Sequence, residues 1–260
     1  MFGAVVGDII GSHWEFNPTK DYNFPLFWED SHFTDDTVMT MAVAKWLIGC
    51  KSLSADELIK IMQDFGRRYP DRQYGESFAK WIVSPNPKPY NSFGNGAAMR
   101  VSPVAFYGQS LETVLELAEL TASVSHNHPE GIKGAKAVAA AIYLARGGYS
   151  KEMIRDIISG FFGYDLNREI NKIRADYRWD VSCQGSVPES IIAFLEGDNF
   201  EDVIRKAVSL GGDSDTMACI AGSIASQMYP IPAKIGDQCW ERIPKEFHDI
   251  ILHFQFLVNE

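Results

Sequence analysis

The sequence predicts an all-α protein, because most of the chain repeats one pattern: a helix-capping residue followed by apolar residues at helical spacing. Sustained alternation of apolar and polar residues, which is typical of half-buried strands, is hard to find. The best short strand candidate is 177–183, and its pattern is weak. A content of 46% hydrophobic residues in 260 is ample for a sizeable core. Since no Ser- or Gly-rich linker divides the chain, we expect one compact domain over residues 1–260.

Capping residues mark several of the expected helices. Ser54 and Glu57 form a capping box ahead of an apolar stripe, while Ser150 and Asn199 stand before two further stripes. A last amphipathic helix is expected after Pro244. The other helices are expected at 3–15, 36–49, 75–84, 97–106, 111–124, 129–146, 187–197 and 214–228. The segment 84–94 is too rich in proline for a helix and should be an ordered loop.

Charge and cysteine content exclude several classes of protein. With 24 Lys+Arg against 34 Asp+Glu the formal charge is -10, which argues against nucleic-acid binding by neutralisation of phosphates. The four cysteines are scattered without a C-x-x-C pair, which indicates reduced, buried thiols and a cytoplasmic protein. The N-terminus lacks a basic region and carries Asp8 in its apolar run, and no 18-residue apolar segment follows. We therefore expect a soluble protein without membrane contact, and a monomer.

Two acidic clusters each stand directly before an apolar segment that is expected to be a buried helix. Two carboxylates about 4 Å apart repel by roughly 4 kcal/mol at an effective dielectric near 20, so a bound cation would stabilise them. The candidate ligands all offer oxygen atoms, which favours magnesium, manganese or calcium over zinc. They are Thr34, Asp35, Asp36, Asp213, Asp215 and Thr216. The alternative is that these residues simply cap helices, but a cap needs one side chain and each cluster supplies two carboxylates.

A glycine-containing turn in Ser92–Arg100 is a second candidate site. Gly94 and Gly96 let backbone amides approach a ligand closely, and the helix expected after them offers the positive end of its dipole to an anion. Phe93 could stack on a base. The same turn is also ordinary in front of a helix, so by itself it is weak evidence for binding.

Two further polar stretches lie at helix ends. His126 lies just before the helix that Pro129 begins, near its positive end, whereas His128 is better explained as a cap of that helix. In the opening helix, Asp8 and Glu15 fall on one face of an otherwise apolar segment, which indicates that this face meets a site. The alternative is that Asp8 bonds to the backbone of a neighbouring loop and Glu15 is exposed.

Together these stretches resemble the ADP-ribosylglycohydrolase family, which contains dinitrogenase reductase-activating glycohydrolase and the vertebrate ADP-ribosylhydrolases. The matching segments are Gly7–Gly11 with Glu15, Thr34–Thr37, Gly94–Arg100, Ser125–His126 and Gly211–Thr216. The resemblance implies an all-α domain with two magnesium ions in a cleft, for which manganese is a possible substitute. It implies that the oxygen ligands named above hold these ions. It also implies that ADP-ribose is held by Gly75, Ser92, Phe93, Gly94, Asn95, Gly96 and His126.

The activity implied by the resemblance is hydrolysis of the glycosidic bond between ADP-ribose and an acceptor, either a protein side chain or a small molecule. Glu15 would be the acid/base or gating carboxylate, and Asp213 or Asp36 would receive the proton of the attacking water. The chain departs from the family pattern in two places. Ser214 replaces a threonine that is usual in relatives, and Gln73, in the expected phosphate-binding loop, stands where relatives can have glycine.

Two other functions remain open from the sequence. The same carboxylates could serve a metal-dependent phosphohydrolase that cleaves a nucleotide pyrophosphate. The chain could also be a binder of ADP-ribose without catalysis, or a structural protein that kept the fold. The sequence leaves the acceptor open as well, since arginine, serine, other acceptors and O-acetyl-ADP-ribose all present the same ADP-ribose half.

Overall fold

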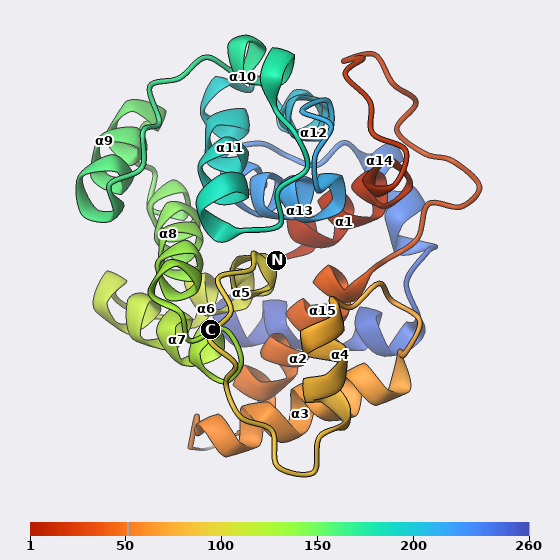
Figure 1. Cartoon of the computed structure of the whole chain (residues 1–260), viewed down its shortest axis with the longest axis vertical. Helices are drawn as coiled ribbons and strands as arrows, with labels where there is room; N and C mark the ends of the chain where they lie inside the picture. Colours follow the sequence, from red (N-terminus) through yellow and green to blue (C-terminus); the bar gives the residue numbers. More distant parts are fainter. Residues whose placement is uncertain (51, 260) are drawn as a thin grey trace.

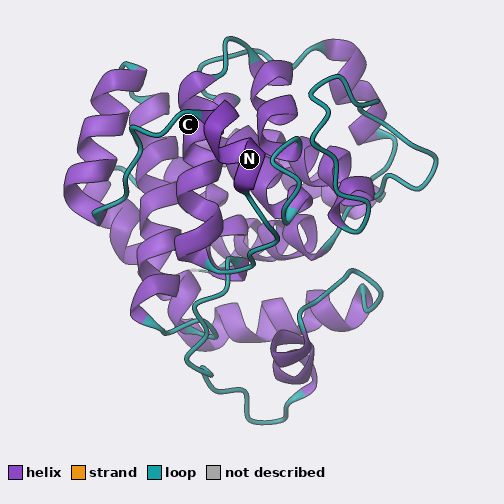
Figure 2. Ribbon diagram, turned by 45° about the horizontal axis from the view of Figure 1, so that its top comes forward, coloured by secondary structure: helices purple, strands orange, loops and turns teal. Residues whose placement is uncertain are grey.

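The computed structural model describes residues 1–50 and 52–259, and it confirms the all-α prediction (Figures 1 and 2). Within this part of the chain fifteen helices are connected by loops, and there is no strand. The helices are α1 (Phe2–Glu15), α2 (Asp35–Gly49), α3 (Ala55–Arg68), α4 (Glu76–Val83), α5 (Gly96–Met99), α6 (Ser102–Tyr107), α7 (Leu111–Ser123), α8 (Pro129–Arg146), α9 (Lys151–Phe162), α10 (Ile170–Asp176), α11 (Cys183–Glu196), α12 (Phe200–Val208), α13 (Ser214–Ala225), α14 (Ala233–Trp240) and α15 (Lys245–Asn259). Among the described residues, none of these helices has both the length and the apolar character that crossing a bilayer requires.

Helices α1 and α13 lie side by side in the middle of the molecule (Figure 1). Their backbones come close because α1 presents glycines to α13. A Cβ atom added at Gly7 would lie 2.0 Å from the carbonyl oxygen of Ala218, and one at Gly11 would lie 2.4 Å from the Cα atom of Asp215. At the other end, Gly3 faces Gly222. The two helices are therefore antiparallel, and the end of α1 meets the beginning of α13.

Asp8 fixes the beginning of α2 against α1. Its carboxylate is fully buried and accepts hydrogen bonds from the backbone N–H of Thr34 (3.0 Å) and from that of Thr37 (3.1 Å). The hydroxyls of both threonines also donate to it. The expectation that Asp8 bonds to the backbone of a neighbouring loop is thus confirmed. The expectation that Glu15 is exposed is wrong, since Glu15 is only 8% exposed.

Helix starts that were predicted from capping side chains are confirmed. Ser54, His128, Ser150 and Asn199 each accept a hydrogen bond from a backbone N–H of the first turn of their helix. The segment 84–94 is a loop, as expected. Two short helices, α10 and α14, were not predicted. Neither has a side-chain cap, so the signal that marked helices such as α3, α9 and α12 is missing there.

The single helix expected at 97–106 is broken into α5 and α6. Pro103 has no N–H to bond the carbonyl of Met99, so the α-helical ladder is interrupted at this point. The freed Met99 oxygen instead accepts from the Cys219 thiol (3.4 Å) and from the Thr40 hydroxyl (3.4 Å). Arg100 lies in the break, with a fully buried side chain.

The strand candidate at 177–183 is wrong. In the described part of the chain, one isolated bridge, between Gly94 and Ser182, is all that pairs this segment with another, and α11 begins directly after it at Cys183. The helix starts earlier than the predicted 187 because Ser182 caps it, and Pro188 is accommodated inside the helix. The bridge ties 177–183 to the glycine turn around Gly94, so both segments border the same region.

Candidate active site

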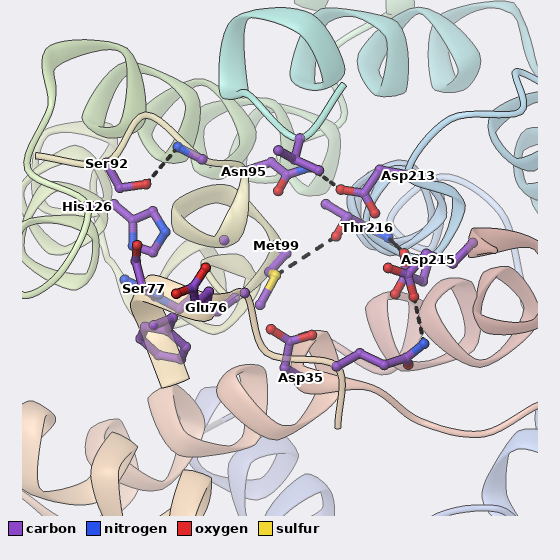
Figure 3. Close-up of a pocket in the computed structure, with 18 of the residues that line it drawn as sticks. Asp35, Glu76, Ser77, Ser92, Asn95, Met99, His126, Asp213, Asp215 and Thr216 are labelled. Atoms are coloured by element: carbon purple, nitrogen blue, oxygen red, sulfur yellow. Dashed lines mark hydrogen bonds between the residues drawn. The ribbon is translucent and has the colours of Figure 1, made fainter. Parts of the chain in front are cut away.

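A cavity of about 420 Å³ opens where the two acidic clusters and the glycine turn meet (Figure 3). It is bordered by the end of α1, the starts of α2 and α13, and the loops before α4 and α5. Most of the predicted site residues line it: Glu15, Asp35, Gly75, Ser92, Gly94, Asn95, Gly96, His126, Asp213, Asp215 and Thr216. Three predicted residues are not part of its lining, namely Thr34, Asp36 and Phe93.

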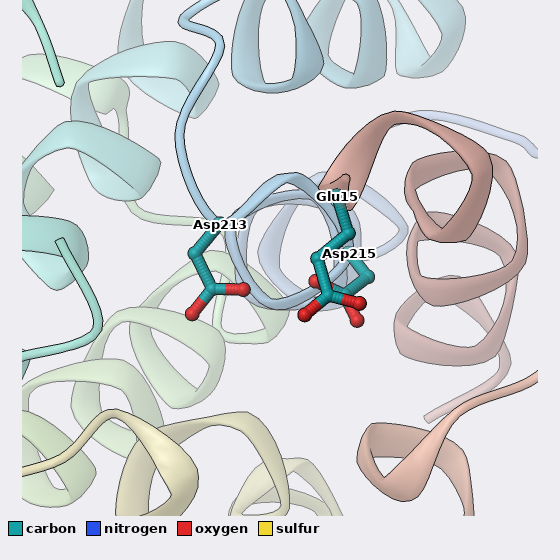
Figure 4. Close-up of side chains that lie close together, drawn as sticks. All are labelled: Glu15, Asp213 and Asp215. Carbon is teal, nitrogen blue, oxygen red and sulfur yellow. The ribbon is translucent and has the colours of Figure 1, made fainter. Parts of the chain in front are cut away.

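Three carboxylates converge at one end of the cavity (Figure 4). Glu15, Asp213 and Asp215 each offer an oxygen atom, and these atoms lie within 4.8 Å of one another. The close approach of α1 to α13 explains this cluster, since it brings the last residue of α1 to the first turn of α13. Gln73 Nε2 donates to Glu15 (2.7 Å), and Asn95 Nδ2 donates to Asp213 (2.7 Å). The family resemblance implies an acid/base role for Glu15, apart from the metal ligands, whereas in the structure its carboxylate lies beside two of the proposed ligands.

The carboxylates of Asp35 and Asp36 have different surroundings. Asp35 lines the cavity. Asp36 is buried behind it, where one oxygen, Oδ2, accepts from the Thr216 hydroxyl (3.2 Å). The other oxygen, Oδ1, is buried and has no hydrogen-bond partner among residues 1–50 and 52–259. Asp36 therefore connects the two acidic clusters through Thr216 and keeps one oxygen free.

Burial raises the pKa of every carboxyl group in this centre. The pKa of Glu15 rises to about 9, first because burial disfavours its charged form and then because Asp215 and Asp8 are close. That of Asp213 rises to about 6, again mainly through burial. The pKa values of Asp35, Asp36 and Asp215 lie well above their usual range, because burial and the neighbouring carboxylates act in the same direction.

This centre fits a hard divalent cation. The donor atoms are carboxylate and hydroxyl oxygens, the kind of ligand that magnesium and manganese prefer. The free, buried Oδ1 of Asp36 is costly unless a cation or a proton satisfies it. A cation would also reverse the mutual repulsion of Glu15, Asp213 and Asp215.

The opposite wall of the cavity is formed by the glycine turn and His126. A Cβ atom added at Gly96 would lie 3.1 Å from His126 Nε2, so a larger residue would crowd this ring. Burial lowers the pKa of His126 well below its ordinary value, and the charge of Arg100 adds to this effect. The imidazole is therefore neutral. Phe93 lies next to this wall but its ring is 47% exposed and edge-on to His128, outside the cavity lining.

Several lining residues were not among the predicted site residues. They include Gln73, Tyr90, Arg100, Trp179 and Val181. Gln73 and Arg100 fall within segments that had been noted, and an arginine at a buried helix position is itself a signal. Trp179 and Val181 belong to the segment mistaken for a strand, so nothing in their pattern pointed to a site.

This all-helical scaffold with an acidic cavity is a known fold. A solved chain described as an ADP-ribosylglycohydrolase-related protein complex superposes on it with a TM-score of 0.75. The two sequences are 21% identical, and the match covers 98% of this chain and 95% of that chain. At this identity the likeness concerns the fold alone.

The family is given by the sequence comparison. Residues 1–254 match the family model described as ADP-ribosylglycohydrolase, and the chain belongs to that family. It is therefore a hydrolase of glycosyl bonds. It is 35% identical to an uncharacterized protein of Archaeoglobus fulgidus, over 90% of this chain and 88% of that protein. It is 26% identical to ADP-ribosylhydrolase ARH3 of Homo sapiens, over 88% of this chain and 84% of that protein.

Proposed function

We propose that this chain is a magnesium-dependent hydrolase that cleaves the glycosidic bond between ADP-ribose and an acceptor and releases intact ADP-ribose. The observation that carries the proposal is the convergence of Glu15, Asp213 and Asp215 at one end of a cavity of about 420 Å³. The glycine turn and His126 form the opposite wall of that cavity. Membership of the ADP-ribosylglycohydrolase family supports the same conclusion.

The oxygen ligands predicted from the sequence would hold the metal. Asp35, Asp213, Asp215 and Thr216 line the cavity, and Asp36 offers its free Oδ1 atom from behind. The Thr34 hydroxyl, by contrast, is already engaged with Asp8 (2.7 Å). Two magnesium ions, when bound, would supply positive charge that offsets the carboxylates and polarises substrate oxygens, and manganese would serve in their place.

The protein's own side chains would handle the protons. Cleavage at an anomeric carbon passes through a state that resembles an oxocarbenium ion, which anionic surroundings stabilise. Between the two candidate proton acceptors, Asp213 is better placed than Asp36, because it lines the cavity and Asn95 orients it. Glu15, held by Gln73, is placed to act as the acid/base at the leaving group.

The ADP-ribose half would lie along the wall opposite the carboxylates. Gly94 and Gly96 allow the ligand to approach the backbone, and Ser92 Oγ already accepts from the N–H of Gly94 (3.1 Å). Gly75 precedes α4, and nothing lies within 4 Å of the position that a Cβ atom would take there. Contact between Phe93 and the adenine stays a prediction, since that ring lies outside the lining.

A panel of substrates tests this proposal. Arginine-, serine- and nucleobase-linked ADP-ribose and O-acetyl-ADP-ribose would be incubated with the protein in magnesium and in chelator. Intact ADP-ribose, formed from at least one substrate only with the metal, is the expected product. AMP with ribose phosphate would instead indicate a phosphohydrolase. Binding of ADP-ribose without turnover of any substrate would indicate a binding protein.

A further inference from the structure

Arg100 is a buried cation in the cavity wall whose hydrogen bonds are incomplete. Its side chain is fully buried, and it borders the cavity. Its Nη2 atom donates to the carbonyl oxygen of Thr121 and to the hydroxyl of Ser125, both at 2.8 Å. Its Nε and Nη1 atoms have no partner in the described part of the chain. Burying a charged group with unpaired N–H donors costs free energy, so the two bonds that Nη2 does make are central to the role of Arg100.

The Ser125 hydroxyl has only one consistent hydrogen-bond arrangement. A guanidinium group can only donate, so Ser125 Oγ must be the acceptor of the bond from Arg100. Its own proton then needs an acceptor, and the remaining side-chain neighbour is Nδ1 of His126, at 2.8 Å. If Nδ1 itself carried a proton, the Ser125 hydrogen would be buried without an acceptor, since Ser125 is fully buried.

This arrangement decides where His126 carries its proton. The ring is neutral because burial and the charge of Arg100 lower its pKa, so it holds one ring proton. With Nδ1 accepting from Ser125, that proton is on Nε2. The Nε2 atom faces the turn that contains Gly94 and Gly96, since Cβ atoms added at these glycines would lie 3.6 Å and 3.1 Å from it. Among residues 1–50 and 52–259 the ring is hydrogen-bonded through Nδ1, and Nε2 has no partner.

We propose that Arg100 and Ser125 are positioning residues that hold His126 in the Nε2–H tautomer, so that the cavity presents a hydrogen-bond donor to a phosphate oxygen of the ligand. The assignment of the ligand as a pyrophosphate compound rests on the proposed function, whereas the tautomer does not. Arg100 acts through Ser125 and needs no contact with the ligand. The Nε2–H group of His126 would also disfavour a ligand that places a hydrogen-bond donor against it.

Nuclear magnetic resonance of the histidine ring nitrogens tests the tautomer in the unliganded protein. His126→Gln identifies the signals of the ring. In the unaltered protein we expect the proton on Nε2, and in Ser125→Ala and Arg100→Met a mixture of both tautomers. Ser125→Thr, which keeps a hydroxyl, should restore the Nε2–H form. Ser102→Ala is the matched control, because it removes a buried hydroxyl that has no partner within the described residues.

Two results would overturn the proposal: a proton on Nδ1 in the unaltered protein, or an unchanged tautomer in Ser125→Ala. The first needs no variant, so it remains decisive even where a substitution prevents folding.

Calorimetric titration tests the consequence for binding. Ser125→Ala should lower the affinity for ADP-ribose about tenfold, the scale of one well-placed hydrogen bond, and change the affinity for adenosine less than about twofold. Ser125→Thr should recover the loss. An equal loss for both ligands would contradict the phosphate contact. Failure of the unaltered protein to bind ADP-ribose would count against the proposed function alone, since the ring spectra still decide the positioning role.

Discussion

At the scale of single residues, Asp36 and Gln73 carry the most information about the centre. Asp36 is buried with one satisfied and one free oxygen, which is an expensive state for a carboxylate that has no cation or proton. Gln73 adopts a left-handed backbone conformation, with φ of 65°, which is unusual for a residue other than glycine. Its side chain bonds Glu15, so the strained residue also holds a carboxylate of the cavity.

Replacing Asp35 and Asp36 together by asparagine should abolish turnover, with a loss of more than about a hundredfold, because two proposed metal ligands disappear. The fold should survive, since the change removes mutual repulsion within the centre. Substrate turnover and circular dichroism measure the two effects. Asp237→Asn, an exposed change on α14, is the control and should behave like the unaltered protein. Full activity in the double variant would rule out the metal mechanism.

Substitutions of Gln73 should separate backbone strain from the bond to Glu15. Gln73→Ala loses the bond and keeps the unfavourable backbone, so it should lower the free energy of unfolding by about 1–2 kcal/mol. Gln73→Gly loses the same bond but relieves the strain, and should be about 1 kcal/mol more stable than the alanine variant. Urea unfolding measures both, with kcat expected to fall in both variants. Equal stability of the two would show that residue 73 is not strained.

At the scale of helices, the pairing of α1 with α13 positions the centre. Gly3, Gly7 and Gly11 form a stripe of small residues along α1, and without it Glu15 could not reach the start of α13. The stripe is visible in the sequence, but its partner is not, because glycine spacing says nothing about which helix it faces. The two acidic motifs could be paired from their residues, whereas their contact with Glu15 required the packing.

Gly7→Ala should cost at least about 2–3 kcal/mol of unfolding free energy, because the added Cβ atom would lie 2.0 Å from the backbone oxygen of Ala218. The matched control is Gly160→Ala on α9, where nothing lies within 4 Å of the added atom. That change should stabilise the protein by up to about 1 kcal/mol, since alanine favours a helix over glycine. Chemical denaturation of both variants provides the comparison. Similar effects of the two changes would contradict the close packing of α1 on α13.

Helices were predicted correctly where capping residues mark their first turn. Prediction failed where contacts with distant parts of the chain determine the structure. Ser54 and Asn199 cap their helices through contacts within one turn, so the sequence contains the whole signal. The break before Pro103 was missed although the proline itself is a local signal. Only the partners of the freed Met99 oxygen, Thr40 and Cys219, come from distant helices and are hidden in the sequence. The segment 177–183 alternates weakly like a strand, yet within residues 1–50 and 52–259 it has no neighbouring strand to pair with.

At the scale of the whole molecule, one cluster of buried hydrophobic side chains extends from Met1 to Phe254. We therefore propose that residues 1–260 form a single domain, in agreement with the expectation from the sequence. The net charge of -10 is distributed unevenly, since several carboxylates are gathered and buried around the cavity. Their burial couples the stability of the entire fold to pH and to metal.

The metal-free protein should lose stability as pH rises. The pKa of Glu15 is about 9 in the folded state against 4.5 as its ordinary value, so the folded state binds more protons than the unfolded state between these values. Stability that protonation supplies at low pH is then lost as pH rises from about 4.5 towards 9. Asp213, with a folded pKa of about 6, adds to the loss in the lower part of this range.

Melting temperatures in chelator and in magnesium, measured from pH 5 to pH 9, check this expectation. The melting temperature should fall with pH in chelator and vary less in magnesium if, as proposed, magnesium binds the ionised carboxylates of the folded state. Asp237→Asn should reproduce both profiles, because the Asp237 side chain is exposed and belongs neither to the cavity lining nor to the carboxylate cluster. A melting temperature that rises with pH in chelator would contradict the burial of uncompensated carboxylates.

The antiparallel contact of α1 and α13 also bears on the order of events during synthesis. The ribosome makes α1 before α13, but the surface that covers the glycine stripe of α1 belongs to residues 214–225. Glu15 is therefore synthesised long before Asp213 and Asp215. A nascent chain that stops before α13 cannot form the carboxylate centre. Until then the face of α1 that carries Gly3, Gly7 and Gly11 lacks the helix that covers it in the folded protein.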